Sequence, residues 1–192
     1  FGSDAAIGQD PDAFRLQMGT LYAWGCQPLL SSIIAKPPKE GDPTSEFLRE
    51  LVQHFNGVAK PYLTGAEWVP ISVRTPGSPA SKRPIDLVVA EHRVEYGKMR
   101  KSTRIWTGPA VLASAWNHGD SLAVTMINIT GQDQTVTLRA PDLVADEVHI
   151  VPKTEVSVED ADGLLTMGFT IPAGGARTCA VRQANPSAAR NG

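Results

Sequence analysis

The apolar segment from Cys26 to Leu30 constrains this chain more than any other stretch. It is too short and too apolar for an amphipathic helix, so it predicts a buried strand of the kind found in parallel sheets. The backbone donors and acceptors of such a strand need partners on both edges. Two arrangements satisfy this need. Residues 1 to about 70 pack directly on the rest of the chain, or they end a parallel α/β domain whose earlier part lies outside this sequence.

The segment before this strand carries the signals of a helix. Asp10 is a suitable N-cap, Pro11 fits the first helical position, and apolar residues then recur at helical spacing up to Tyr22. Gly25 is a plausible end for that helix, because glycine adopts the left-handed backbone that often follows a last turn.

A second helix is predicted over residues 45–60, after a loop rich in proline and glycine. Either Thr44 or Ser45 would cap it. We expect it to end before Pro61, because the proline ring removes a backbone donor and clashes with the preceding turn.

The rest of the chain reads almost entirely as β-structure. Apolar residues recur at every second position from Trp106 onward, and short turns such as 117–120 and 131–134 separate the runs. The predicted strands cover 85–90, 111–116, 122–129, 135–139, 147–151, 155–158, 164–171 and 176–182. The basic stretch Val94–Arg104 is predicted to be a solvated connection, with a binding patch as the alternative.

The predicted fold class is therefore α+β, with an N-terminal helix–strand–helix piece followed by an antiparallel β-sandwich. A partly closed barrel is the alternative for the β region. The expected divisions are residues 1–72, a linker at 73–84 whose sequence is rich in Pro, Gly and Ser, the sandwich at 85–183, and a disordered tail at 184–192.

Composition excludes some partners. The net charge is −2 and charges of both signs are interspersed, so no basic surface for nucleic acid is expected. No apolar run reaches the length of a membrane span. Residues 1–12 lack the pattern of a signal peptide, yet the numbering is compatible with a longer precursor. Secreted, periplasmic and cytoplasmic locations all stay open.

The sequence offers no motif for a metal or cofactor. Cys26 and Cys179 have no neighbouring Cys or His at metal-ligand spacing, so two separate buried thiols are expected, with a disulfide between them as the alternative. The four histidines are dispersed, no Gly-x-Ser-x-Gly motif occurs, and Ala173–Ala176 reads as a hairpin turn rather than a phosphate loop. Asn128 begins a glycosylation pattern inside a predicted strand, where a chance match is the better explanation.

Two motifs carry a resemblance to a known family. These are the turn Trp24-Gly25-Cys26-Gln27-Pro28 and the strand pair formed by 111–116 and 122–128. Together with the helix and linker between them, they resemble the C-terminal end of a group of mostly uncharacterised bacterial glycoside-hydrolase-like proteins. That family has a (β/α)8 barrel followed by an antiparallel β-sandwich. The resemblance covers Phe14 to about Arg182.

The resemblance implies that residues 1–72 are the end of a TIM-like barrel. Asp10–Trp24 would be its seventh helix, Cys26–Leu30 its eighth strand, and 45–60 its eighth helix. Such barrels need about 250 residues, so seven strands would have to come from the remainder of the same protein or from another chain.

The same resemblance places a candidate sugar site at the C-terminal end of the eighth strand. Trp24 offers a flat apolar face and the Gln27 amide can bond hydroxyls, whereas the structural alternative makes them a core residue and a satisfied strand-end amide. Asp42 is assigned to the same candidate substrate site. Glu40 or Asp42 could act as a general acid or base, but carboxylates on loops rich in Pro and Gly are usually only solvated.

The implied function is the C-terminal portion of a carbohydrate-active glycoside hydrolase, inactive by itself because no pair of catalytic carboxylates can be nominated. The alternative is a non-catalytic carbohydrate-binding or structural β-sandwich module with a helical N-terminal extension. For that module, Trp106 and Trp116 are either exposed stacking platforms or residues of the core or a domain interface, and the second role is favoured.

Overall fold

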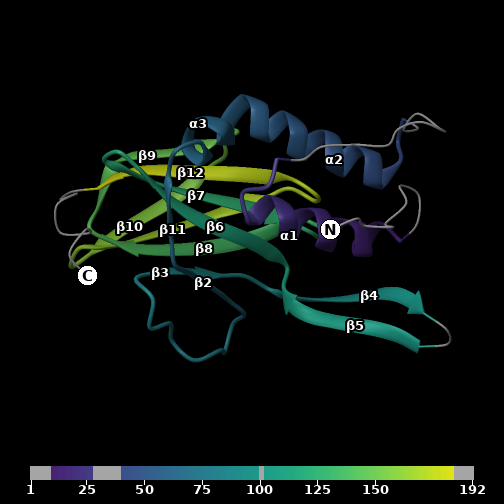
Figure 1. The fold of residues 1–192 in the computed structure, drawn as a ribbon. Coiled ribbons are helices and arrows are strands. Elements are labelled where there is room, and N and C mark those ends of the chain that lie inside the picture. Colours follow the sequence, from purple (N-terminus) through teal and green to yellow (C-terminus); the bar gives the residue numbers. More distant parts are fainter. Residues whose placement is uncertain (1–9, 28–39, 100–101, 184–192) are drawn as a thin grey trace.

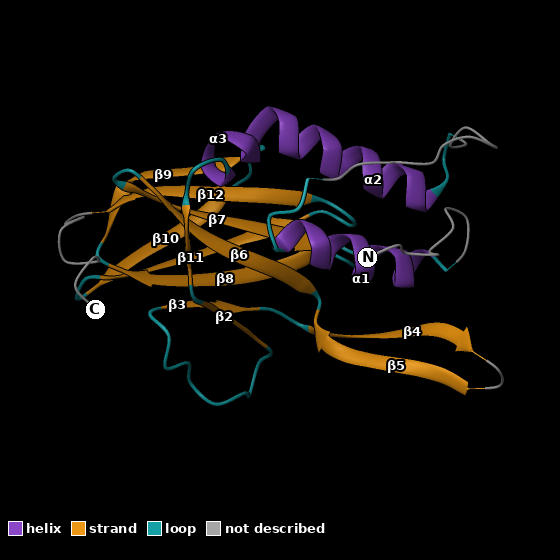
Figure 2. Ribbon diagram, viewed as in Figure 1, coloured by secondary structure: helices purple, strands orange, loops and turns teal. Residues whose placement is uncertain are grey.

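The computed structural model describes residues 10–27, 40–99 and 102–183, and in them two five-stranded sheets face each other as a β-sandwich (Figures 1 and 2). The first sheet, sheet A, has the order β1 (Glu67–Val69), β6 (Val111–His118), β7 (Ser121–Asn128), β12 (Ala176–Gln183), β9 (Leu143–Val151). The second, sheet B, has the order β10 (Val156–Ala161), β11 (Leu164–Ile171), β8 (Gln134–Pro141), β3 (Ile85–Val88), β2 (Ile71–Arg74).

The fold class predicted from the sequence is confirmed: the chain is α+β, with helices and a mostly antiparallel sandwich. One pair departs from the antiparallel rule, because β2 runs parallel to β3. The loop 75–84 joins these two strands, so the stretch predicted as a linker connects neighbours within sheet B.

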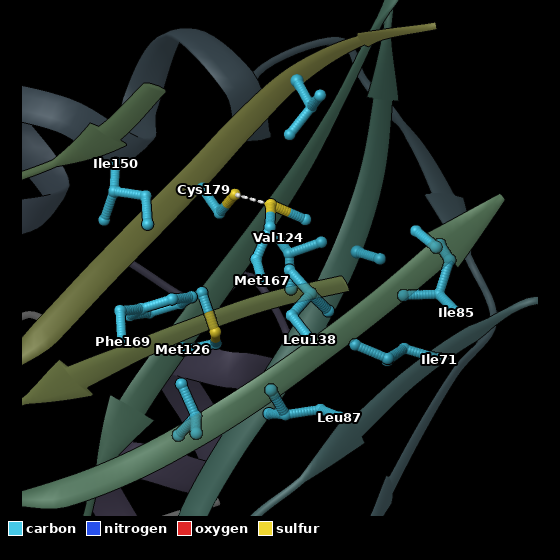
Figure 3. Close-up of a cluster of buried hydrophobic side chains, with 14 of the residues drawn as sticks. Ile71, Ile85, Leu87, Val124, Met126, Leu138, Ile150, Met167, Phe169 and Cys179 are labelled. Carbon is cyan, nitrogen blue, oxygen red and sulfur yellow. Dashed lines mark hydrogen bonds between the residues drawn. The ribbon is translucent and has the colours of Figure 1, made fainter. Parts of the chain in front are cut away.

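Side chains from the inner faces of both sheets fill the sandwich core (Figure 3). Alternation along the strands explains which residues reach it: in β11, Leu165, Met167, Phe169 and Ile171 are buried. Cys179 of β12 lies among them, with its thiol 3.7 Å from the sulfur of Met167 (Figure 3). Burial raises the pKa of this thiol to about 12. Both cysteines are free, but Cys26 is exposed rather than buried as predicted.

The helices form a third layer. α1 (Pro11–Ala23) and α2 (Pro43–His54) lie along the outer side of sheet A (Figure 1). The helix that begins as α2 continues through a π-helical turn (Phe55–Ala59) into α3 (Lys60–Leu63).

The predicted end before Pro61 is wrong, and so is the predicted cap. The π-helical turn resets the hydrogen-bond pattern, which leaves Pro61 in the first turn of α3, where a missing backbone donor costs little. Asp42, two residues before Thr44, is the residue that caps α2.

The helices share a core with the sheet. Phe14, Tyr22, Phe47 and Leu51 pack with Ile127 and Ala176 of sheet A and with Ile129, which follows β7. Helix α1 comes very close to the sheet at Gly19, where an added Cβ would lie 2.7 Å from Cγ2 of Ile129. The described helices thus pack directly on the β region, as the first of the two arrangements requires. This contact does not test the second arrangement, in which the same residues also end a parallel α/β domain.

The apolar segment 26–30 is only partly described. Cys26 and Gln27 have no regular secondary structure and are exposed, which differs from the predicted buried strand. Residues 28–30, and the tail 184–192, lie outside the described residues. Sheet strands begin at Glu67 and Ile71, ahead of the boundary expected at residue 72. Whether residues 1–72 end a (β/α)8-type domain stays a prediction.

The basic stretch predicted as a connection is instead a hairpin. β4 (Glu91–Met99) and β5 (Ser102–Pro109) pair antiparallel and project from the body of the sandwich (Figures 1 and 2). Its base is anchored by Val94, which is buried, and by Trp106 directly opposite, which packs against the helical cluster. The sequence did not predict this strand pair, because it contains many charged residues. Its few buried apolar residues lie near one end.

Candidate functional site

Trp24, Gln27 and Asp42, the three residues predicted to touch substrate, sit at the ends of α1 and α2. Trp24 is the C-cap of α1 and 73% exposed. Gln27 is also exposed, beyond the end of the same helix. Asp42 is the N-cap of α2 and half-buried.

A glycine-dependent helix end holds Trp24 outward. Gly25 has φ of +80°, its N–H bonds the carbonyl of Tyr22, and the N–H of Cys26 bonds the carbonyl of Leu21 at 3.1 Å. These two bonds define a Schellman motif, which ends α1 where the sequence predicted. The indole of Trp24 therefore projects from a rigid helix end rather than from a loop.

Asp42 has a structural task. Its Oδ2 accepts hydrogen bonds from the backbone N–H of Ser45 at 2.8 Å, the Ser45 hydroxyl at 2.6 Å and the Thr44 hydroxyl at 2.5 Å. The hydrogen bonds from Ser45 and Thr44 hold the pKa of this carboxyl below its usual range. Asp42 is an ionised helix cap, and its role in substrate binding stays a prediction.

Two further tryptophans lie near the end of α1. Trp68 of β1 stands directly opposite Trp116 of β6. Because Ala115 faces the sandwich core, its neighbour Trp116 faces the helices, and its cross-strand partner Trp68 does too. A Cβ built on Gly25 would lie 3.0 Å from the ring of Trp116, which places the end of α1 against that ring.

Trp24, Trp68 and Trp116 are called the tryptophan surface below. Trp68 is 54% exposed on an edge strand, and Trp116 is half-buried. The indole N–H of Trp116 donates to the Ser114 hydroxyl at 2.9 Å, so its polar edge is satisfied within the protein. The surface therefore offers flat apolar rings, and the ring of Trp116 has no unsatisfied donor. Such rings can pack against the C–H faces of sugars.

Sequence reasoning singled out two of these three residues and missed Trp68. The strand that carries it, β1, has only three residues, which is too short for alternation to show which way Trp68 faces. Trp106, also considered, folds instead over Gly108, where an added Cβ would lie 2.5 Å from its ring. It packs against the helical core, in agreement with the structural role favoured for it.

The helix–sheet interface contains a chain of buried polar groups. The Tyr22 hydroxyl lies 2.6 Å from Nδ1 of His54, and Nε2 of His54 lies 3.3 Å from Oγ1 of Thr178. Thr178 in turn contacts the Thr125 hydroxyl at 3.1 Å. The chain links α1, α2, β12 and β7.

Burial controls ionisation in this network. It raises the pKa of Tyr22, with the Glu50 carboxylate adding to the effect, so this hydroxyl stays protonated and donates to Nδ1 of His54. The proton of the neutral imidazole then sits on Nε2 and is donated to Thr178. Burial, aided by the charge of Arg177, lowers the pKa of His54 to about 4. At 3% exposure this histidine is a structural link.

Other motifs resolve into structure as well. The Asn128 side chain is fully buried. Its amide N–H groups donate to the backbone carbonyls of Gln132, Ile171 and Pro172, and its carbonyl oxygen accepts from the N–H of Thr130. It therefore organises two turns and does not present a glycosylation acceptor.

Within the described ranges no three His, Cys, Asp or Glu side chains gather as a metal site. In the same part of the chain, no helix has both the length and the apolar character to span a membrane.

The fold and site thus describe a β-sandwich covered on one side by helices, with an exposed tryptophan surface at one edge. No protein-family model and no curated protein matches this sequence. An alpha-amylase from H.orenii is similar in structure at 12% identity and a TM-score of 0.30, over 74% of this chain and 20% of that one. A debranching enzyme from Nostoc punctiforme is similar at 14% identity and a TM-score of 0.37, over 92% of this chain and 32% of that one. This chain spans about a fifth and a third of those proteins, and scores this low assign neither family nor activity.

Proposed function

We propose that this chain is the C-terminal portion of a carbohydrate-active glycoside hydrolase, in which a helix-covered β-sandwich contacts sugar through the tryptophan surface. In this proposal the catalytic carboxylates belong to polypeptide outside this sequence, and residues 1–72 are the end of a (β/α)8-type domain. Trp24 and Gln27 then face the substrate from the end of α1, as the family resemblance implies.

The observation that carries the proposal is the exposure of Trp24 and Trp68 beside Trp116. Soluble proteins bury most of their tryptophan area, so two largely exposed indoles, one at the end of α1 and one on the edge strand β1, need an explanation. Both are held by rigid elements: a helix end closed by a Schellman motif and a strand paired to β6. Because the backbone at both positions is fixed before binding, a sugar that packs on these rings need not order the chain that carries them.

A second function is favoured by a different observation. The helices share one core with sheet A, so the described part of the chain is consistent with a module whose helices belong to the sandwich. The alternative is a non-catalytic carbohydrate-binding or structural β-sandwich module with a helical N-terminal extension. Both candidates use the same tryptophan surface for sugar and differ in whether a catalytic domain adjoins it.

Affinity electrophoresis of the chain through gels containing soluble starch, xylan or hydroxyethyl cellulose tests the sugar contact. At least one polysaccharide should retard the wild-type chain, and the double variant W24A/W68A should weaken that binding about tenfold, since each stacked ring contributes about 0.5–1.5 kcal/mol. I105A removes an exposed apolar side chain from the β4–β5 hairpin and should leave retardation unchanged. Absence of retardation in all three gels would contradict the proposal.

Hydrolysis assays separate the catalytic question. The isolated chain should release no p-nitrophenol from p-nitrophenyl α- and β-glycosides of glucose, galactose and xylose. Turnover that survives repurification and persists in W24A/W68A would mean that a complete active site lies within this sequence. That result would overturn the assignment of catalysis to another segment.

A further inference from the structure

A hollow of about 350 Å³ opens beside α3 on the same helix-facing side of sheet A. It is formed by segments far apart in the sequence: α3, the turn between β6 and β7, and the strands β9 and β12. The lining side chains that matter here are Tyr62, Asp120, Ser121, His149, Ala180 and Arg182.

The register of sheet A explains the hollow. Ala180 stands opposite Ala123 on one neighbouring strand and opposite His149 on the other. Two alanines side by side leave space on this face of the sheet, because their side chains are short and those around them are longer. The next pair on the same face, Ser121 with Arg182, continues the hollow toward the β6–β7 turn.

One wall of the hollow is aromatic. Tyr62 is half-buried, and its ring meets the ring of His118 edge to face, with 6.2 Å between centroids and an interplanar angle of 82°. This contact restrains the ring of Tyr62 beside the hollow. A restrained ring presents an apolar surface of the kind against which the C–H face of a pyranose packs.

The rest of the lining is polar and carries both signs of charge. Asp120 and Arg182 form an ion pair at 3.3 Å, with side chains 57% and 55% exposed. The Ser121 hydroxyl donates to the Asp120 carboxylate at 3.3 Å, and the His149 side chain is exposed beside Ala180. Carboxylate and guanidinium together supply acceptors and donors in one place, which matches a ligand whose hydroxyls do both.

From this arrangement we propose that the hollow is a binding subsite for one neutral pyranose unit, with Tyr62 packing on the sugar ring and the Asp120–Arg182 pair bonding its hydroxyls. An anion such as phosphate fits less well, because the Asp120 carboxylate repels it at the point where Arg182 would attract it. The proposal rests on the proposed carbohydrate function for the class of ligand, but it concerns residues separate from the tryptophan surface.

NMR titration of the ¹⁵N-labelled chain tests the subsite, with D-glucose, D-galactose, D-xylose, D-mannose and inorganic phosphate as separate probes. At least one sugar should shift the amide signals of Ser121, Ala180 and Arg182 in a saturable way. The variant Y62A should weaken that binding about three- to tenfold, whereas Y62F keeps the ring and should retain it. A180L should abolish it by filling the hollow, and T64A, on an exposed neighbour of α3, should change nothing.

The variant W68A separates the two proposals. Sugar-induced shifts at Ser121 and Ala180 that persist in W68A support the subsite even if polysaccharide retardation is lost. If sugars shift only signals near Trp24 and Trp68, the subsite is wrong and the proposed function stands. Saturable shifts with phosphate alone, or no shift with any of the four sugars at 100 mM, would also overturn the subsite.

Discussion

Single residues decide how closely the layers of this protein approach each other. Gly19 faces Ile129 with no room for a Cβ, so α1 reaches sheet A because this position has no side chain. Gly57 is also helical but has no atom near the position of an added Cβ. The two glycines have the same chemistry and opposite environments, and therefore form a matched pair.

Replacing these two glycines by alanine, one at a time, should change the free energy of unfolding in opposite directions. G19A should lower the free energy of unfolding by about 1–2 kcal/mol, because overpacking against a branched side chain outweighs the gain in helix propensity. G57A should raise it by about 0.5–1 kcal/mol through lower entropy of the unfolded chain. Urea unfolding at neutral pH measures both, and a G19A variant as stable as wild type would show that α1 does not dock as described.

At the scale of elements, the helical layer is joined to the sheet by a polar chain as well as by apolar packing. His54 carries that chain from α1 to β12 and stays neutral because its surroundings are dry and Arg177 lies nearby. The charge of Arg177 from β12 lowers the pKa of His54, and a hydrogen bond with the backbone of Val151 opposes this effect. Tyr22 from α1 bonds the imidazole, while Glu50 from the same helix as His54 acts on Tyr22 and pairs with Arg177. Protonation would place a charge in this interface and remove the acceptor at Nδ1.

The stability of the helix–sheet interface should therefore fall in acid. The pKa of His54 is about 4 in the folded chain and about 6.5 in the unfolded chain, so between these values the unfolded state binds more protons. The contribution of neutral His54 to the free energy of unfolding is fully present above pH 6.5 and declines as pH falls toward 4. It totals up to about 3 kcal/mol. Urea unfolding at pH 7, 6, 5 and 4 should show this loss in wild type and in H149Q, where an exposed histidine is replaced.

The variant H54Q provides the decisive comparison. It should be less stable at pH 7 but lose correspondingly less stability on acidification, because the group that titrates is gone. An NMR titration of the wild-type imidazole gives a second readout that does not depend on the variant folding. A His54 pKa near 6.5 in the folded chain would contradict the buried, neutral assignment.

At the scale of the whole molecule, helices and sheets form one shared body of buried side chains. Leu51 of α2 is fully buried in a cluster that includes residues of β7 and β12. A chain organised in this way should unfold as one cooperative unit, because neither layer keeps its apolar face covered without the other.

We expect the helical signal in far-ultraviolet circular dichroism and the tryptophan fluorescence to change together during urea unfolding. L51A should lower the midpoint of both transitions equally, at a cost of about 2–5 kcal/mol, while Q53A on the exposed side of α2 should leave both in place. Two separated transitions in wild type would instead favour the division near residue 72 that the sequence predicted.

Local patterns in the sequence predicted much of this protein. Asp10, Pro11 and Gly25 marked the ends of α1 correctly because capping depends on a few neighbouring residues. Alternation predicted β11 over 164–171 without error, since one face of that strand lies in the core. The pattern was weaker for the β4–β5 hairpin, where Glu91, Arg93 and Arg104 are exposed and few apolar residues alternate with them. It was also weaker for the helix beyond Pro61, where a π-helical turn changed the register.

The candidate site was predictable only in part, since Trp24 and Trp116 could be nominated from the sequence but Trp68 and the juxtaposition of these residues could not. Trp68 and Trp116 are distant in sequence and meet through the pairing of β1 with β6, and the hollow beside α3 depends on the register of β7, β12 and β9. Sequence alone determined the elements whose caps or periodicity are strong, such as α1 and β11, because these signals act within a few residues. Tertiary structure alone decided which faces meet and which rings stay exposed, because those outcomes depend on contacts between segments separated by tens of residues.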